Sequence, residues 1–598
     1  MNRYLPTGNE MISLPKINEN TAGIEDFTYL SMAHKGLIEV RGGENTPLIV
    51  PFLQIDGEEA LLTDKHWSRA HYWIPVLSAK AGRHEFSLTV LTPVGERGFA
   101  MKLTITAPED TQVVWGLKGC WDSSWHCINE DKELDGKAHC YESGWNDSIV
   151  FDFRCGAPVF SFAPMSSRKT QADYTSDGNR ISYTLSRQDT LRKGEQKELI
   201  FYWGLGYEEV AAATSAKEML RRGWDWEYRR TAAWLDKRVC QMATPKLTEV
   251  YNTNLFFCIF YSTGITLDTE ELVCATSRGT RYYVSAAYWD RDVLLWAFPA
   301  ILDADPQLAE EILHYIFGRQ RKNLGIHSRY IDGTVLEPGF ELDELMSPVL
   351  ALEAFVEQTG SRDILEEANV KQGIAQILKV LSSMKHPDIA LYETFLQPTD
   401  DEILYPYLTY NNMLVWRSLK AIARLYPDRY AHLAQQAEEV KSAIYRHCVF
   451  YDNQKKPYFG WSVDLQGQHN IYDEPPGSLQ LLPYYGFCES TDEIWQNTVS
   501  MIRSPAYEYS FADSPIAEIG CAHAPYPWIL SLCNSLLCGY EAQAFRELEI
   551  LEMDNGIACE SVDPVKGSCT TGAAFATCSG FLCHSMKTAH QKEVSHEK

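Results

Sequence analysis

The hydrophobic positions of the chain follow two different periods, and the change falls near residue 210. Before it, short runs alternate apolar and polar residues or are rich in β-branched side chains, and Gly, Pro and Asp separate them. This pattern is typical of antiparallel strands. The runs are GLIEVRGG, PLIVPFLQIDG, HEFSLTVLTPVG, FAMKLTITAPED, TQVVWGLKG, DSIVFDFRCG and KELIFYWGLG. We therefore expect residues 1–210 to form an antiparallel β-sandwich.

After residue 210 the apolar positions recur with the period of an α-helix. Residues 211–245, beginning AAATSAKEMLRRGWDWEYRR, indicate a partly interrupted helical linker. Over residues 246–598, roughly twelve helical segments alternate with loops. Twelve helices are enough for six concentric pairs. The prediction is an α+β multidomain chain: an N-terminal β-sandwich, a linker helix and a C-terminal (α/α)6 barrel.

Composition narrows the classes of function. The chain has 598 residues and a formal net charge of -26, which repels phosphate backbones and anionic lipid surfaces. We expect no nucleic-acid partner and no membrane partner, and a homo-oligomer is compatible with the sequence. The N-terminus lacks a basic segment followed by an apolar one, so we expect a soluble cytoplasmic protein. The 16 cysteines form no CxxC pair, which favours reduced structural thiols over a metal site.

Aromatic residues are abundant and often stand beside acids or amides. The chain contains 16 Trp and 32 Tyr. Ring faces stack on the C–H surfaces of sugars, and neighbouring polar groups bind the hydroxyls. An aromatic-rich core explains the same composition. The acidic residues of the loops are therefore needed to distinguish a sugar-binding site from such a core.

Three loops before helical segments carry acids that their positions do not require. In SAAYWDRDVLLWAF, Asp290, Arg291 and Asp292 interrupt an apolar helix start next to Trp289. An Asp there can cap the helix. The additional Arg and second Asp favour a group of side chains that bind sugar hydroxyls.

The second loop is ETFLQPTDDEILYPYLTYNNMLVW, in which Asp400 and Asp401 precede Tyr410, Asn411 and Asn412. Two adjacent acids are often only a solvated turn. An aromatic setting can instead raise the pKa of one carboxyl into the range of a general acid.

The third loop, DNGIACESVDPVKGSC, places Glu560 before the last helical segment. A turn-stabilising network accounts for such residues, and so does a carboxylate that activates water. An inverting glycosidase needs two carboxyl groups about 6.5 to 9.5 Å apart on opposite faces of the sugar.

The ordered set WDRD (289–292), FELDEL (340–345), PTDD (398–401), YNNM (410–413) and ESVD (560–563) resembles the (α/α)6 glycosidases of glycoside hydrolase family 125, the metal-independent exo-α-mannosidases. It resembles glucoamylases and amylo-α-1,6-glucosidases more distantly. The resemblance covers about half of the chain. WDRDVLLW departs from the family pattern by an added Asp and by the residues that follow.

The resemblance implies an exo-acting inverting glycoside hydrolase that removes a terminal α-mannosyl or α-glucosyl residue from an oligosaccharide or glycoside, without metal or other cofactor. It implies that Asp400, or its neighbour Asp401, is the acid and Glu560 the base. The expected substrate-binding residues are Trp289, Asp290, Arg291, Asp292, Glu341, Asp343, Tyr410, Asn411 and Asn412.

Three other functions use similar features. A phosphorylase of the same architecture replaces the activated water with phosphate and has no need of Glu560 as a base. A sugar epimerase works through histidine pairs, for which His314, His327 and His523 are the candidates. A non-catalytic carbohydrate-binding protein keeps the aromatics but can dispense with the acids.

Overall fold

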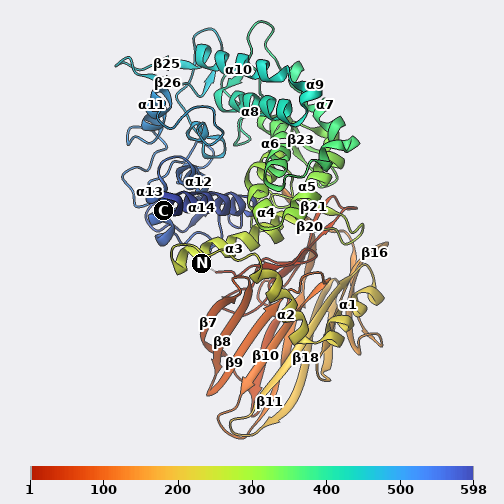
Figure 1. Ribbon diagram of the computed structural model, residues 1–598. Helices are drawn as coiled ribbons and strands as arrows, with labels where there is room; N and C mark the ends of the chain where they lie inside the picture. The colour runs from red at the N-terminus through yellow and green to blue at the C-terminus, as the bar shows by residue number, and fades with distance from the viewer. Residues whose placement is uncertain (1–2, 597–598) are drawn as a thin grey trace. The chain divides into compact units, whose positions relative to one another are not determined.

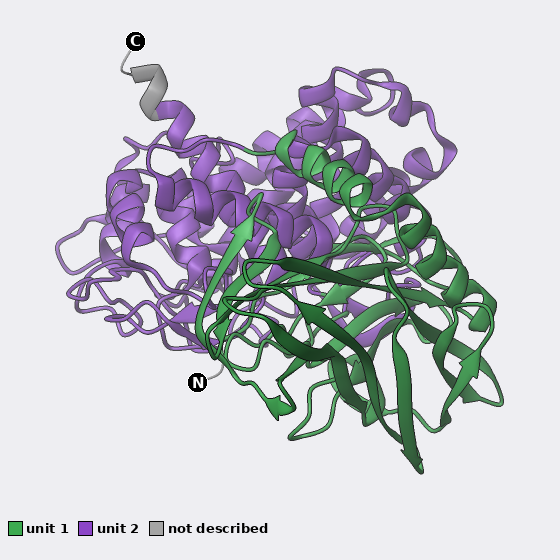
Figure 2. Cartoon of the chain, turned by 90° about the horizontal axis from the view of Figure 1, so that it is seen from below, with its two compact units in different colours: residues 1–239, 263–273, 278–286 green, residues 240–262, 274–277, 287–598 purple. Residues whose placement is uncertain are grey.

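The structure, a computed structural model, describes residues 3–596. The chain divides into two compact units (Figure 2). Unit 1 consists of residues 1–239, 263–273 and 278–286, and unit 2 of residues 240–262, 274–277 and 287–598.

Unit 1 is built on three antiparallel sheets, and neighbouring strands of the largest are seen side by side in Figure 1. The eight-stranded sheet has the order β14 (Lys137–Ser143), β15 (Ser148–Cys155), β16 (Ala157–Ser166), β19 (Gln196–Gly206), β10 (Gly98–Thr106), β9 (His84–Leu91), β8 (Ile74–Ala81), β7 (Leu62–Ala70). The six-stranded sheet has the order β1 (Thr7–Gly8), β2 (Ser13–Leu14), β3 (Asp26–Ser31), β4 (Gly36–Arg41), β12 (Ser123–Ile128), β13 (Glu130–Glu133). The five-stranded sheet has the order β17 (Gln171–Asp177), β18 (Arg180–Leu191), β11 (Thr111–Trp121), β5 (Val50–Ile55), β6 (Glu58–Glu59).

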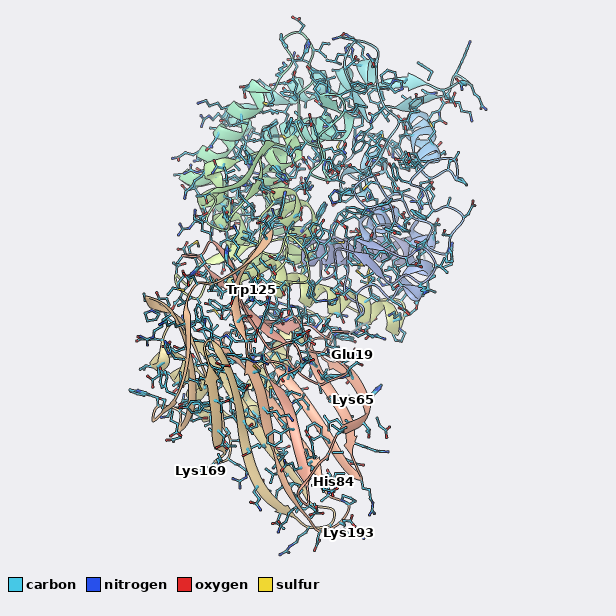
Figure 3. All side chains as sticks on the ribbon, turned by 180° about the vertical axis from the view of Figure 1, so that it is seen from behind. Glu19, Lys65, His84, Trp125, Lys169 and Lys193 are labelled. Atoms are coloured by element: carbon cyan, nitrogen blue, oxygen red, sulfur yellow. The ribbon has the colours of Figure 1, made fainter. Side chains whose placement is uncertain are left out.

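Each of the seven runs that predicted a strand contains one, so the expectation of N-terminal antiparallel sheets is confirmed. Alternation explains why: in β9 the even-numbered positions from His84 to Leu88 are buried and Glu85 is exposed. Buried aromatic rings from different sheets meet in one core. Phe27 of β3 lies 4.6 Å from Phe162 of β16, between ring centroids. In Figure 3, His84 and Lys193 lie at one end of this unit and Trp125 lies towards the other.

Two helices follow the sheets. Helix α1 (Glu209–Arg222) packs on β16 and β19. It ends at Gly223, whose φ of 85° is a conformation that favours glycine. Helix α2 (Trp224–Asp236) begins directly afterwards. The predicted linker, residues 211–245, therefore contains two helices broken at a glycine. The short strands β20 (Thr263–Ile265) and β21 (Leu272–Cys274) pair later in the chain.

Unit 2 is mainly helical. Its α-helices are α3 (Pro245–Ser262), α4 (Phe298–Ala304), α5 (Pro306–Gly318), α6 (Leu342–Thr359), α7 (Ala368–Ser383), α8 (Thr409–Leu425), α9 (Pro427–Tyr430), α10 (Leu433–His447), α11 (Glu493–Ile502), α12 (Ile529–Leu537), α13 (Glu541–Ile550) and α14 (Ala576–His596). A π-helix, η1 (Arg291–Ala297), precedes α4. The 3-10 turns are η2 (Gln320–Asn323), η3 (Asp363–Glu366), η4 (Pro475–Gly477) and η5 (Leu479–Leu481). Short strands stand between them: β22 (Ile326–Arg329), β23 (Val335–Phe340), β24 (Tyr407–Leu408), β25 (Val449–Tyr451), β26 (Pro457–Phe459), β27 (Ser462–Val463), β28 (Ser561–Val562) and β29 (Cys569–Thr571).

Several of these helices pack against one another on both sides of η1. The π-helix η1 contacts α6, and α6 contacts α8; on its other side η1 contacts α14, and α14 contacts α12 and α3. The turns η4 and η5 contact α12. Figure 1 shows α6 beside α8 and α12 beside α14. The segment PPGSLQLLPYYG forms only the turns η4 and η5, because Pro483 within it has no backbone N–H and would break a helix.

The start of the helix after Trp289 is widened into η1. Pro299 is the second residue of α4 and cannot donate to the carbonyl four residues earlier, and its ring crowds that carbonyl. A wider π-turn before it relieves this conflict, and π-turns are frequent at functional sites. This turn carries Arg291 and Asp292.

Among residues 3–596, no helix combines the length and the apolar character that a membrane span needs.

Candidate active site

Arg291 is a buried guanidinium surrounded by carboxylates, and its residue is 2% exposed. Its nitrogen-to-oxygen distances are 2.6 Å to Glu341, 2.8 Å to Asp400, 3.2 Å to Asp343, 3.6 Å to Asp292 and 3.6 Å to Glu344. Burial opposes the charged form, but Asp400 and Glu341 raise the pKa of Arg291 well above its ordinary range. Arg291 is therefore a permanent cation, and we call these six residues the carboxylate cluster.

One guanidinium cannot neutralise five acids, so some of the carboxyl groups keep protons. Burial raises the pKa of Asp292 to about 7, against the opposing effect of Arg291. Burial likewise raises the pKa of Glu341 to about 7, and that of Glu344 well above its ordinary value. At neutral pH the carboxylate cluster is a store of protons next to a cation.

Helix α6 supplies three of the acids from one turn. Glu341 stands at its N-cap position, and Asp343 and Glu344 lie in its first turn. The N-terminal end of a helix has unpaired N–H groups and a partial positive charge, which stabilise acids there. Glu344 accepts hydrogen bonds from the backbone N–H groups of Arg291, at 3.1 Å, and of Asp290. The first turn of α6 thus holds the start of η1 in place.

Asp290 lies on the other side of this turn and faces the protein interior. It accepts hydrogen bonds from the Tyr288 hydroxyl and from Arg329 of β22. Asp290 and Arg329 are both fully buried. Both carboxyl oxygens of Asp290, a residue expected to bind substrate, thus accept hydrogen bonds from within the protein.

Asp292 points to a different set of partners. The hydroxyls of Thr276 and Thr577 both donate to its Oδ2, each at 3.3 Å. Thr577 belongs to α14, so residues nearly 300 positions apart in sequence meet at this carboxyl. These contacts leave Asp292 Oδ1 on the side of Arg291, at 3.6 Å from Nε.

Asp400 reaches Arg291 from a tight turn. Its φ is 70°, the left-handed region that a non-glycine residue occupies only when its surroundings hold it there. The preceding Thr399 gives its backbone N–H, at 2.9 Å, and its hydroxyl, at 2.8 Å, to the buried carboxyl of Glu474. The Asp400 side chain is 35% exposed. Glu474 therefore anchors the turn that presents both Asp400 and Asp401.

Asp401 points away from Arg291 and towards His523. Its Oδ2 lies 3.3 Å from His523 Nδ1, and His523 Nε2 lies 3.9 Å from Glu560 Oε1. One imidazole ring thus separates the carboxyl of Asp401 from that of Glu560. The hydrogen bond to His523 lowers the pKa of Asp401, and the same bond raises the pKa of His523.

His327 closes the cluster on the side of Trp289. Its Nδ1 lies 2.5 Å from Glu341 and 3.6 Å from Asp400, and its Nε2 lies 3.3 Å from Glu337. Burial opposes its charged form, but the bonds to Glu337 and Glu341 raise the pKa of His327 to about 10. His327 is therefore a second cation of the site.

His327, Glu341 and Asp400 also offer ligand atoms within 4.8 Å of one another, which is close enough to hold a metal ion. The guanidinium of Arg291 already contacts both carboxylates of this group, at 2.6 and 2.8 Å. A metal cation there would face Arg291 at short range, and His327 could bind it only after losing its proton. These residues fit an arginine-centred ion-pair network better than a metal cage.

The remaining expected residues divide into two sets. Asn411 joins the cluster, since its Nδ2 donates to Asp343 Oδ1 at 3.3 Å. Trp289 is buried with its Nε1 3.4 Å from His327, and the Tyr410 hydroxyl lies 3.4 Å from that of Tyr485. Asn412 lies apart from these side chains, because its amide bonds the backbone of Tyr392 and Leu408.

Sequence reasoning missed four residues that hold the site. Glu344 stands inside the quoted FELDEL segment, and its position in the first helical turn is a signal that was available. Glu474 precedes Pro475 and Pro476, an unusual place for a buried acid, whereas Arg329 carries no local signal. His523 entered only as an epimerase candidate; His314, its companion there, pairs with Glu367 near the surface.

The comparisons with known proteins agree with the resemblance noted in the sequence. The family model of the metal-independent α-mannosidases of glycoside hydrolase family 125 matches residues 385–586, which include PTDD and ESVD but not WDRD. The resemblance is thus confirmed over that part of the chain. No curated protein sequence matches the chain significantly.

Three solved structures share the fold. A metal-independent α-mannosidase of Streptococcus pneumoniae, in a non-productive complex with α-1,6-mannobiose, aligns with a TM-score of 0.51 and 17% identity over 58% of this chain and 94% of that one. A bacterial glucoamylase complexed with acarbose aligns with a TM-score of 0.64 and 11% sequence identity, over 99% of this chain and 95% of that one. A candidate kojibiose phosphorylase from the human microbiome aligns with a TM-score of 0.58 and 10% sequence identity, over 92% of this chain and 79% of that one. The family match supports a carbohydrate-active enzyme of the glycosidase type.

The Asp290–Arg329 pair generates a stability prediction. Asp290→Asn removes one charge of a fully buried pair and leaves the guanidinium of Arg329 poorly compensated, which typically costs about 3 to 5 kcal/mol. We expect a correspondingly lower free energy of unfolding in urea. Glu366→Gln is the matched control, because Glu366 pairs with Lys371 and its side chain is 79% exposed. Exposed pairs contribute at most about 1 kcal/mol. Equal losses for the two variants would contradict a supporting role of the buried pair.

Proposed function

We propose that the protein is an exo-acting inverting glycoside hydrolase that removes a terminal α-mannosyl or α-glucosyl residue from an oligosaccharide or glycoside. The observation that carries this proposal is the meeting of two carboxyl-bearing segments on either side of His523. The turn at Asp400 and the loop at Glu560 come from distant parts of the sequence, and a single imidazole ring spans the gap between them.

Inverting hydrolysis needs an acid and a base on opposite faces of the sugar. In the proposed reaction, Glu560 takes a proton from a water molecule as its oxygen attacks the anomeric carbon. The bond from that carbon to the glycosidic oxygen breaks, and Asp400 gives its proton to the departing oxygen. The sugar leaves with the opposite anomeric configuration, and the two carboxyl groups have exchanged protonation states.

The contacts favour Asp400 over Asp401 as the acid. A general acid must carry a proton before reaction, and the hydrogen bond to His523 lowers the pKa of Asp401. Asp400 shares Arg291 with four other acids, whereas Asp401 lies outside the carboxylate cluster. Asp400 Oδ1 faces Arg291, and no described residue hydrogen-bonds its Oδ2.

Arg291, Asp292, Glu341 and Asp343 would grip the terminal sugar, with Asn411 orienting Asp343 and with Trp289 and Tyr410 as buried aromatic neighbours. Asp290 and Asn412 would instead support the backbone that carries them. We further propose that the helices of unit 2 form an (α/α)6 barrel and that the sheets of unit 1 form a β-sandwich. The packing of η1 between α6 and α14 supports a closed ring of inner helices.

The acid and base roles predict different substrate dependence. Glu560→Ala should be nearly inactive on all glycosides, because nothing else activates the water; such groups contribute about 10²- to 10⁴-fold. Asp400→Asn should be severely impaired on disaccharides but partly spared on aryl glycosides, whose leaving groups need little protonation. Initial rates on both substrate types test this, and NMR of the first product should show the inverted anomer.

Asp401→Asn tests the neighbouring acid in the same experiment. Sparing of Asp400→Asn on both substrates, with selective loss in Asp401→Asn, would move the acid by one residue. A retained product anomer would contradict the inverting mechanism. A dependence of turnover on inorganic phosphate would make the enzyme a phosphorylase.

The proposed sugar contact of Asp292 leads to a separate expectation. Asp292→Ala should raise KM and lower kcat, because hydrogen bonds to the terminal sugar strengthen towards the transition state. Asp563→Ala, in an exposed turn of the Glu560 loop, is the control and should keep both constants. Unchanged kinetics of Asp292→Ala would limit this residue to binding Thr276 and Thr577.

The arginine-centred network also predicts metal independence. Hydrolysis should persist in EDTA, because the cation beside Glu341 and Asp400 is Arg291. Activity of the enzyme is measured before and after prolonged dialysis against the chelator. Loss of activity that zinc or calcium restores would place a metal at His327, Glu341 and Asp400.

A further inference from the structure

We propose that His523 is a positioning residue that keeps the base Glu560 ionised by acting as an imidazolium held between Asp401 and Glu560. This inference rests on the proposed function and extends it to a residue and a charge that the acid–base pair itself does not include.

Main-chain hydrogen bonds join the loop of His523 to the loop of Glu560. His523 precedes α12, and the N–H of Ile529 at the start of that helix donates to the Glu560 carbonyl at 3.1 Å. The N–H of Val562 donates to the Pro527 carbonyl at 2.9 Å. The two loops are therefore tied by main-chain bonds, and the distance between the two side chains is not left to the flexibility of either loop.

The two ring nitrogens of His523 make different contacts. Nδ1 lies 3.3 Å from Asp401 Oδ2, within hydrogen-bond range, and Nε2 lies 3.9 Å from Glu560 Oε1, beyond it. The second contact is thus an attraction between charges and does not occupy a lone pair of Glu560. A base needs both conditions: a neighbouring cation that keeps it ionised, and an oxygen able to accept a proton.

Burial gives a neighbouring cation an effect on the carboxyl of Glu560. Glu560 is 3% exposed, and removal of a carboxylate from water favours its protonated form. A protonated Glu560 cannot activate water. An opposite charge within about 4 to 6 Å favours the ionised form, commonly by one to three pKa units.

Asp401 supplies the charge that keeps His523 protonated. The hydrogen bond to Asp401 is the largest influence on His523 and raises its pKa; burial opposes it, and the charges of Glu560 and Asp400 act in the same direction as Asp401. The Trp528 ring packs edge-on against the imidazole of His523, with 6.2 Å between the ring centroids. The nearby thiol of Cys521 stays neutral, since burial raises its pKa well above the ordinary value. The two adjacent acids of PTDD therefore have different roles. Asp400 belongs to the carboxylate cluster, and Asp401 acts on the base Glu560 through His523.

The test is the pH profile of kcat/KM for an aryl glycoside, with His523→Gln, Asp401→Asn and the double variant. Loss of the cation favours the protonated form of Glu560, so the acidic limb of the pH profile should move to higher pH. For His523→Gln we expect a shift of about one unit, equivalent to a roughly tenfold lower kcat/KM at pH values below the limb. Asp401→Asn should shift the limb less and in the same direction, and the double variant no further than His523→Gln.

His314→Gln is the matched control, because it makes the same change at an imidazole that pairs with Glu367 at the surface, and its profile should equal that of the parent. His523→Ala with added imidazole provides a second measurement: imidazole should return the limb towards its original pH. A uniform fall in kcat/KM with the limb unmoved would reduce His523 to a structural residue and overturn the inference. That result is distinguishable from failure of the proposed function, which would appear as an active Glu560→Ala or as a retained product anomer.

Discussion

A single buried guanidinium shared by five carboxylates is the constraint on which the helical unit depends. Charges of one sign cannot be gathered away from water without a counter-charge, and Arg291 supplies it at the centre of the group. Since it cannot lose its proton, the acids around it must adjust, and burial makes several of them keep theirs. A further cation, Arg329, compensates the buried charge of Asp290. The site is thus charged by its acids but held together by its arginines.

The backbone around this group is shaped to place it. The first turn of α6 contributes Glu341, Asp343 and Glu344 at a helix end whose free N–H groups favour acids. The π-turn before Pro299 presents Arg291 and Asp292 side by side. The turn at Asp400 adopts a left-handed conformation, which the bonds from Thr399 to Glu474 maintain. Local strain appears where the chain must aim a carboxyl, and buried hydrogen bonds stabilise it.

The sequence indicated the elements better than the contacts between them. Strands such as β9 and β10 were predictable because one face is buried and alternation is visible. Edge strands such as β13 and β17 were not, because their side chains are almost all exposed and carry no alternating pattern. In the site, WDRD and PTDD stood out as acids in apolar surroundings. Arg329 and the pairing of His523 with Asp401 could not be seen, because those contacts join residues far apart in the chain.

The use of arginine at the centre has a chemical consequence for the pH response of the site. A metal ion would leave when its ligands became protonated, so the whole arrangement would be lost in acid. A guanidinium keeps its charge throughout, and its fork of donors can hold two carboxylates at once. Protonation then proceeds one carboxyl at a time around a cation that does not change. Under the proposed function, the cluster would lose and regain a proton during each turnover while its geometry is preserved, which is the requirement that a general acid places on its surroundings.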